Sequence, residues 1–150
     1  MVSQELDFNL GNKITRMLSD VKLLKFPKII DERGNLSFLE NNNQIPFAIK
    51  RVYWIYDVPG GEERGGHAYL DLQEVIVALS GSFDVVLNDG ITEQKFSLNR
   101  SYNALYVPKL IWRHMENFST NSLAFIATDE FYDKEQYIRD FQKFKEMVNA

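Results

Sequence analysis

Residues 65–74 read GGHAYLDLQE, the most informative stretch of the chain, because it places two chemically active side chains at strand spacing. Side chains two positions apart on a β-strand point to the same face, so His67 and Tyr69 are predicted to share one side of a strand. The apolar run VIVAL at residues 75–79 follows and ends at a Ser-Gly turn that contains Gly81. Such a short apolar run between turn signals indicates a second, buried strand.

The order of these residues resembles the first sequence motif of the cupins, a class of small β-barrels. That motif has two histidines one residue apart, then a glutamate and a glycine. Here His67 takes the first histidine position, Tyr69 the second, Glu74 the acid and Gly81 the glycine. The resemblance implies a barrel with His67 and Tyr69 directed into one cavity.

The second cupin motif is also present in altered form at residues 108–117. Pro108 and Asn117 match it, Leu110 replaces its glycine, and Arg113 falls where the last metal-binding histidine is expected. A guanidinium is always protonated and has no lone pair to give, so Arg113 cannot ligate a metal. The sequence therefore predicts a cupin site that holds no metal ion.

Length and composition agree with one globular domain. The chain has 150 residues, of which 45% are hydrophobic and 13% aromatic, enough for a single sizeable core. A net charge of -4 argues against non-specific nucleic-acid binding. No apolar run approaches the ~20 residues that cross a bilayer, and the first residues lack a signal-peptide pattern. The absence of cysteine excludes disulfides and thiol nucleophiles and is typical of a cytoplasmic protein, which we expect here.

We predict an all-β fold, a cupin of the double-stranded β-helix or jelly-roll type, followed by a C-terminal α-helix. Residues 1–24 are expected to form an N-terminal extension, with a helical turn at 14–21, and residues 25–150 the cupin domain. Asp133 and Gln136 suggest a capping box, and apolar residues then recur at helical spacing, which predicts one amphipathic helix from Asp133 to about Val148. Short strands are predicted at 36–39, 49–56, 75–79, 83–87, 91–98, 106–107 and 123–127.

The candidate catalytic residues are His67 and Tyr69. An imidazole titrates nearest neutrality, so His67 can take up and return a proton, while the phenol of Tyr69 can donate to a carbonyl oxygen or relay a proton. Packing of both in the core is the alternative. Glu74 can be a base, a residual ligand or the partner of an arginine, and these three alternatives remain open.

Arginines and aromatics supply candidate binding residues. Arg64 and Arg113 suit phosphate oxygens or a developing enolate. Tyr53 is predicted to point to the opposite face from Trp54 and Tyr56, so only one of these sets can line a pocket. By the same rule Trp112 and His114 should face away from Arg113, and no role is assigned to His114.

Several ordered blocks, from about Lys25 to the C-terminal segment, resemble the sugar-nucleotide 3,4-ketoisomerases. The blocks are IIDERGNL at 29–36, IPFAIKRVY at 45–53, RGGHA at 64–68, FYD at 131–133 and YIR at 137–139. Tyr69 departs from the pattern, since the family has a second histidine there. The resemblance implies a homodimer that exchanges N-terminal strands, no cofactor, and a role in making deoxyaminosugars for surface glycans.

The reaction implied by the resemblance moves the ketone of dTDP-4-keto-6-deoxyglucose from C4 to C3 through an enediolate. His67 matches the residue that transfers the proton. Arg113 and Arg33 fall near positions that influence which C4 epimer forms, so both join Tyr53, Arg64 and Glu74 as candidate substrate-binding residues. A non-catalytic cupin that binds a nucleotide sugar, and a metal-dependent cupin oxygenase or epimerase, are the alternatives.

Overall fold

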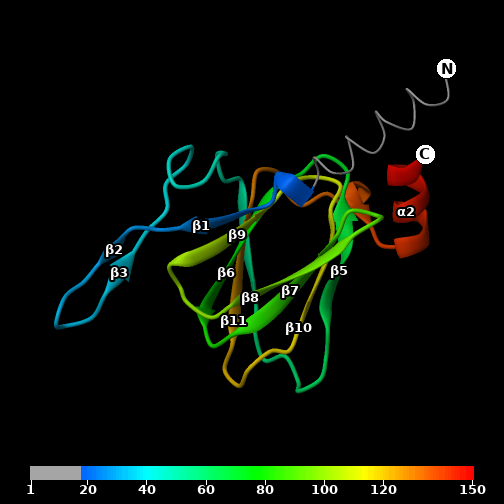
Figure 1. The fold of residues 1–150 in the computed structure, drawn as a ribbon. Helices are drawn as coiled ribbons and strands as arrows, with labels where there is room; N and C mark the ends of the chain where they lie inside the picture. Colours follow the sequence, from blue (N-terminus) through cyan, green and yellow to red (C-terminus); the bar gives the residue numbers. More distant parts are fainter. Residues whose placement is uncertain (1–17) are drawn as a thin grey trace.

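A computed structural model of the protein describes residues 18–150 (Figure 1). Their strands form two five-stranded antiparallel sheets and one separate hairpin. The first sheet has the order β1 (Lys22–Lys25), β9 (Asn103–Val107), β6 (Glu74–Ser80), β11 (Leu123–Thr128) and β4 (Arg51–Ile55). The second has the order β12 (Tyr137–Ile138), β5 (Arg64–Tyr69), β10 (Trp112–Glu116), β7 (Phe83–Asn88) and β8 (Glu93–Leu98). This is the predicted all-β cupin architecture.

The main core lies between the two sheets and follows the alternation of their strands. Ile76 and Ile126 from the first sheet pack with Val85, Leu87 and Met115 from the second, and all five are buried. Successive side chains of a strand point to opposite faces, so the neighbours of these residues point outward. The interior of the barrel is therefore apolar, and the few polar side chains inside it need hydrogen-bond or ion-pair partners.

A second cluster covers the outer face of the first sheet. Residues 26–49 fold back so that Phe26, Ile45 and Phe47 pack on Val75 and Val77, whose side chains point away from the barrel interior. Within this segment the hairpin of β2 (Lys28–Ile29) and β3 (Leu36–Ser37) extends away from the barrel on the side opposite the C-terminal helix (Figure 1).

The C-terminal segment corrects one prediction. A continuous helix from Asp133 to Val148 is wrong, because Asp133 caps only a 3₁₀ turn, η1 (Lys134–Gln136), and the chain then forms β12. The helix α2 spans Phe141–Asn149 and begins at Asp140, whose side chain accepts a hydrogen bond from the amide of Lys143. Strand pairing with β5 overrides the helical spacing that Tyr137 and Ile138 share with the aromatics of α2.

The aromatic face of α2 packs on the outside of the barrel as predicted. Phe141 and Phe144 contact Trp112, which points away from the interior. Strand β1 crosses the boundary expected at residue 24, so residues 22–24 belong to the first sheet. Of the helical turn predicted at 14–21, residues 14–17 lie outside the described part of the chain, and residues 18 and 19 are helical. No helix within residues 18–150 has the length and apolarity to span a membrane.

Candidate active site

His67 and Arg113 face each other across the pairing of β5 with β10. They are paired residues in the antiparallel register, which shifts between Arg113 and Met115. The shift coincides with Gly65, which has a φ of 75° and whose carbonyl accepts a hydrogen bond from Arg113 Nη1 at 3.2 Å. A positive φ suits glycine, so the first glycine of the GGH sequence allows this close approach.

Arg113 and Glu74 form a bidentate ion pair inside the barrel. Arg113 Nε donates to Glu74 Oε1 at 2.6 Å and Nη2 to Oε2 at 3.0 Å, and the two side chains are 1% and 0% exposed. Of the three alternatives for Glu74, the structure shows the pairing with an arginine. The carboxylate and the last ligand position of a cupin metal site are thereby bound to each other, and these residues do not fit a metal ion.

A chain of hydrogen bonds leads from Arg113 to the two tyrosines. Arg113 Nη2 donates to the hydroxyl of Tyr53 at 2.7 Å, and the hydroxyls of Tyr53 and Tyr69 are 3.2 Å apart. Burial raises the pKa of both phenols, and the carboxylate of Glu74 adds to this effect. Both tyrosines are therefore protonated hydrogen-bond donors near neutral pH.

His67 is buried and its Nε2 has no hydrogen-bond partner among the described residues. Its ring contacts those of Tyr69 and Tyr137, with centroids 4.7 and 4.8 Å away. Burial, and then the positive charge of Arg113, lower the pKa of His67 from 6.5 to about 2. The imidazole is thus neutral, and a buried nitrogen without a partner is a group that a ligand can satisfy.

Three residues that the sequence analysis left without a role also lie here. Tyr137 on β12 pairs with Tyr69 on β5, and its hydroxyl accepts a hydrogen bond from Arg51 Nη2 at 3.0 Å. Arg139 stacks on the Tyr137 ring, with its guanidinium carbon 4.4 Å from the centroid. Tyr137 lies on strand β12, and Arg139 follows two positions later. The sequence analysis predicted a helix for this segment and therefore assigned these residues no place in the site.

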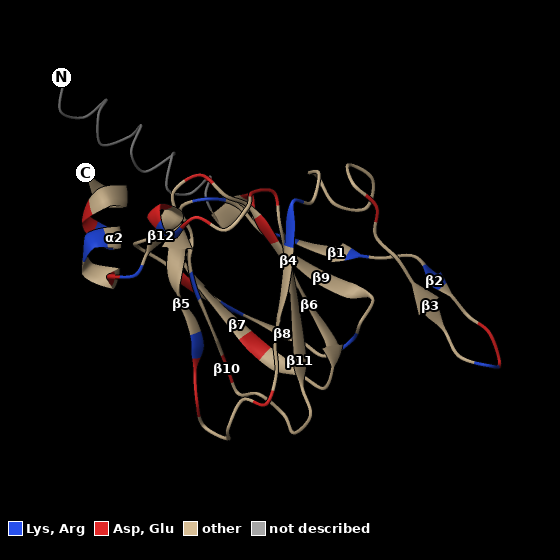
Figure 2. Cartoon of the chain, turned by 180° about the vertical axis from the view of Figure 1, so that it is seen from behind, with Lys and Arg blue, Asp and Glu red and all other residues tan. Residues whose placement is uncertain are grey.

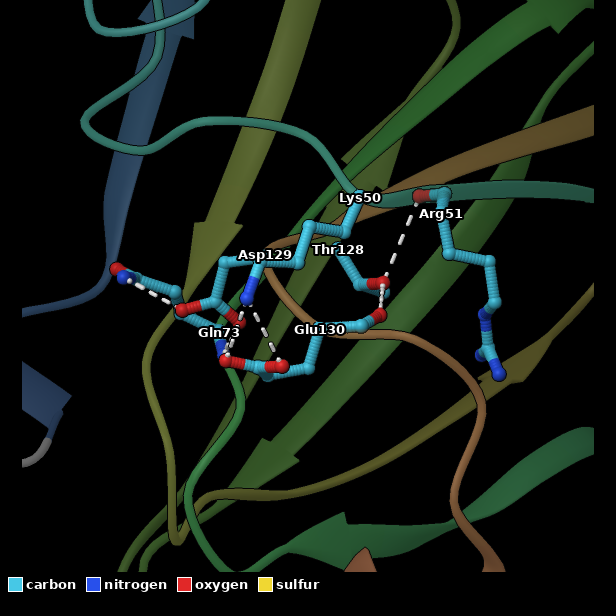
Figure 3. Close-up of polar contacts among 6 residues, drawn as sticks. All are labelled: Lys50, Arg51, Gln73, Thr128, Asp129 and Glu130. Carbon is cyan, nitrogen blue, oxygen red and sulfur yellow. Dashed lines mark hydrogen bonds and ion pairs between the residues drawn. The ribbon is translucent and has the colours of Figure 1, made fainter.

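Polar contacts at the adjoining ends of β4 and β11 hold the backbone of Arg51 (Figure 3). The buried hydroxyl of Thr128 lies 3.5 Å from the carbonyl of Arg51 and 2.8 Å from that of Glu130. Lys50 forms an ion pair with Glu130 at 3.2 Å. Arg51 Nε is buried without a partner among the described residues, so it is a second buried polar atom, besides Nε2 of His67, that a ligand could satisfy.

A cavity of about 460 Å³ lies between β4 and β5, and its wall includes His67, Tyr53, Arg64, Arg113, Tyr137 and Arg139. A second cavity of about 480 Å³ borders Asp71, Gln73, Lys109 and Asp129. In that second cavity Lys109 is paired with Asp71, and Gln73 with Asp129. We therefore assign the active site to the first cavity, where polar atoms lack partners.

The structure brings together five of the predicted site residues but not all of them. His67, Tyr69, Tyr53, Glu74 and Arg113 are joined by the contacts above, and Arg64 is at the rim of the same cavity. Arg33 lies in the turn of the β2–β3 hairpin, where its side chain is 90% exposed and pairs with Asp31. Within one chain the β2–β3 hairpin that carries this residue extends away from the barrel (Figure 1).

Residues 19–149 match the family FdtA, described as WxcM-like, C-terminal. A TDP-4-oxo-6-deoxy-alpha-D-glucose-3,4-oxoisomerase from Aneurinibacillus thermoaerophilus is 42% identical over 127 residues, which cover 85% of this chain and 91% of that protein.

Solved structures agree with this match. A 3,4-ketoisomerase from Helicobacter canadensis superposes with a TM-score of 0.85 at 42% identity, covering 87% of this chain and 98% of that one. An asparagine-for-histidine variant of a 3,4-ketoisomerase from Thermoanaerobacterium thermosaccharolyticum, in complex with TDP-4-keto-6-deoxyglucose, gives 0.84 at 33% identity, covering 86% and 94%.

Proposed function

The chain belongs to the FdtA family (WxcM-like, C-terminal), and from this premise we infer that it is a sugar-nucleotide 3,4-ketoisomerase acting on TDP-4-keto-6-deoxyglucose. The enzyme moves the ketone of the sugar from C4 to C3. The observation that carries the chemistry is His67, a neutral imidazole whose Nε2 lacks a partner in a cavity otherwise rich in donors. A neutral imidazole has a nitrogen lone pair, so His67 is the candidate general base of this cluster.

In our mechanism His67 removes the proton from C3, which is acidic because it is next to the C4 ketone. The electron pair of the C3–H bond forms the C3–C4 double bond, and the ketone oxygen becomes an enediolate oxygen. His67 then returns the proton to C4, while the hydroxyl proton on O3 moves to O4 and the C3 ketone forms. A neutral starting state of His67 is required for the first step, in agreement with its lowered pKa.

We assign the stabilisation of the enediolate to Tyr53, supported by Arg113 and Tyr69. A guanidinium can only donate, so Arg113 occupies one lone pair of the Tyr53 oxygen. When Tyr69 donates to the other lone pair, the hydroxyl proton of Tyr53 is free to bond a sugar oxygen in the cavity. Two hydrogen bonds donated to its oxygen make the Tyr53 hydroxyl a stronger donor. We therefore assign to Tyr53 the transfer of the proton from O3 to O4, and Tyr69 acts through Tyr53.

We assign the diphosphate to the arginines at the rim. The side chain of Arg64 lines the cavity and forms no hydrogen bond or ion pair with another described residue, and Arg139 lines the same cavity. Arg51, which donates to Tyr137 in the cavity wall, offers its unpartnered Nε. Three guanidinium groups suit a dianionic diphosphate, which they can contact through paired hydrogen bonds.

The decisive test is an NMR time course with TDP-4-keto-6-deoxyglucose in heavy water. The wild type is expected to consume the 4-keto sugar and produce the 3-keto sugar. His67→Asn should bind TDP with unchanged affinity and show no turnover, because the base is lost while the arginines remain. His114→Asn, which removes the other histidine, is the matched control and should stay active. Full turnover by His67→Asn would refute the mechanism, and binding without turnover by the wild type would refute the function.

We further propose that the active form is a homodimer in the cytoplasm and that Arg33 acts on the partner's substrate. Ile30 and Leu36 on the β2–β3 hairpin are 78% and 54% exposed, and Trp54 on the edge strand β4 is 56% exposed. Such apolar surface favours a protein contact, and the projecting hairpin can carry Arg33 to a second copy. Native mass spectrometry of the wild type and of Leu36→Asp tests this: the wild type should be dimeric and the variant monomeric. A monomeric wild type would end the proposal.

A further inference from the structure

His114 and Glu116 lie on the outer face of the second sheet, and with Glu63, which borders the catalytic cavity, they form a cluster. Within this cluster, one potential ligand atom from each residue lies within 4.8 Å of the others. His114 and Glu116 are two apart on β10 and so share a face, and Glu63 directly precedes β5, which pairs with β10. The cluster therefore joins two residues of β10 to the loop residue that leads into the neighbouring strand β5.

Two of the three ligand atoms already have a separation suited to a metal ion. His114 Nε2 and Glu116 Oε2 are 3.2 Å apart. Metal bonds of about 2.0–2.1 Å in a tetrahedral arrangement place ligand atoms about 3.4 Å from each other. Glu63 is exposed, so its side chain can move the remaining distance. Three ligands leave a fourth position for water.

The charges around the cluster also favour a cation. Glu63 forms no hydrogen bond or ion pair with another described residue. Lys95 pairs with Oε1 of Glu116 at 2.8 Å and so leaves Oε2, the atom that faces His114, available. In Figure 2 the loop that leads into β5 has acidic positions next to β10. The carboxylate of Glu63 therefore lies near a second carboxylate, that of Glu116, and near the imidazole of His114, and no cation among the described residues pairs with it.

We propose that Glu63, His114 and Glu116 bind a divalent transition-metal ion, with Zn²⁺ as the best match. An imidazole with two carboxylates selects Zn²⁺ and similar ions over Mg²⁺ and Ca²⁺, which take oxygen ligands. Glu63 also borders the catalytic cavity. The ion thus ties the rim of the cavity to β10 from outside the barrel, while the catalytic reaction proceeds without it.

Calorimetric titration of the tag-free, full-length protein with Zn²⁺ tests the site. The chain contains no cysteine and two histidines, so two variants separate the possibilities. We expect one Zn²⁺ per chain, an affinity reduced about tenfold or more in His114→Asn, and an unchanged affinity in His67→Asn. Loss of binding in His67→Asn with retention in His114→Asn would overturn the proposal, because the ion would then lie in the cavity.

Glu63→Gln provides a variant that leaves the fold intact, since the side chain is exposed. It should weaken Zn²⁺ about tenfold, whereas Glu62→Gln, its neighbour outside the cluster, should not. Titration with Mg²⁺ should show no binding at the concentrations that saturate with Zn²⁺. Equal Zn²⁺ affinity of the wild type and Glu63→Gln, or binding of Mg²⁺ as tight as Zn²⁺, would overturn the proposal. These measurements involve no turnover, so their outcome is independent of the isomerase activity.

Discussion

His67 and Arg113 occupy directly opposed positions on β5 and β10, so the candidate base lies beside a permanent positive charge. Burial and this charge together favour the neutral imidazole. The same arrangement keeps Arg113 hydrogen-bonded to Tyr53. One strand pairing therefore sets both the proton acceptor and the donor system of the cavity.

The pH dependence of stability should reveal the neutral state of His67. Its pKa is about 2 in the folded protein against 6.5 as the ordinary value, so between these values the unfolded chain binds the extra proton. The stability that the neutral imidazole contributes is present above pH 6.5 and is lost as the pH falls toward 2. From pH 7 to 5 the wild type should lose about 2 kcal/mol relative to His67→Asn. Urea unfolding at both pH values measures the difference, and parallel pH profiles would contradict it.

Replacement of each tyrosine should distinguish the direct donor from its support. Tyr53→Phe removes the hydroxyl that lines the cavity and should lower kcat about 10²–10³-fold with little change in KM. Tyr69→Phe removes only the donor to Tyr53 and should lower kcat by a smaller factor. Steady-state kinetics on both variants provides the comparison. A larger loss in Tyr69→Phe would make Tyr69 the residue that contacts the sugar.

Much of this site could be predicted from residue spacing. The spacing of His67 and Tyr69 and the altered ligand position of Arg113 depend on the two-residue period of a strand, which is a local property. The outward direction of Trp112 and His114 followed from the same period and is confirmed. These predictions needed no knowledge of which strands pair.

What the sequence did not reveal depends on pairing between distant segments. Tyr137 enters the site only because β12 adds to the edge of β5, and its helical spacing with the aromatics of α2 favoured the wrong element. Arg51 joins the site through its hydrogen bond to the hydroxyl of Tyr137, which is 86 positions away in the sequence. The position of Arg33 depends on the direction in which the β2–β3 hairpin extends. The apolar residues of this hairpin do not predict that direction, because they are exposed within one chain.

Removing one partner of the Arg113–Glu74 ion pair should destabilise the protein strongly, whereas removing both partners should cost much less. Glu74→Gln leaves a buried guanidinium without its counterion and should cost about 3–5 kcal/mol in the free energy of unfolding. Replacing both residues together, by Glu74→Leu with Arg113→Met, should recover most of that loss, because no buried charge is left. Activity should not recover, since Tyr53 loses its cationic donor.

Denaturant unfolding of Glu74→Leu, Arg113→Met and the variant that carries both substitutions forms a double-mutant cycle for this pair. A coupling energy near zero would show that the two charges do not depend on each other. A double variant with normal turnover would show that Arg113 is not needed for the donor system of Tyr53.

The two glycines before His67 should respond differently to alanine. Gly65 has a φ of 75°, and a Cβ there would collide with Nη1 of Arg113. Gly66 has no positive φ, and its Cβ would meet Trp112 at 3.6 Å, an ordinary contact. Gly65→Ala should therefore cost about 1–3 kcal/mol and shift Arg113 away from Tyr53, while Gly66→Ala should change stability by less than about 1 kcal/mol. Thermal and urea unfolding of this matched pair measure the contrast. Equal stability of the two variants would mean that the approach of Arg113 to the β5 backbone is not what requires glycine at position 65.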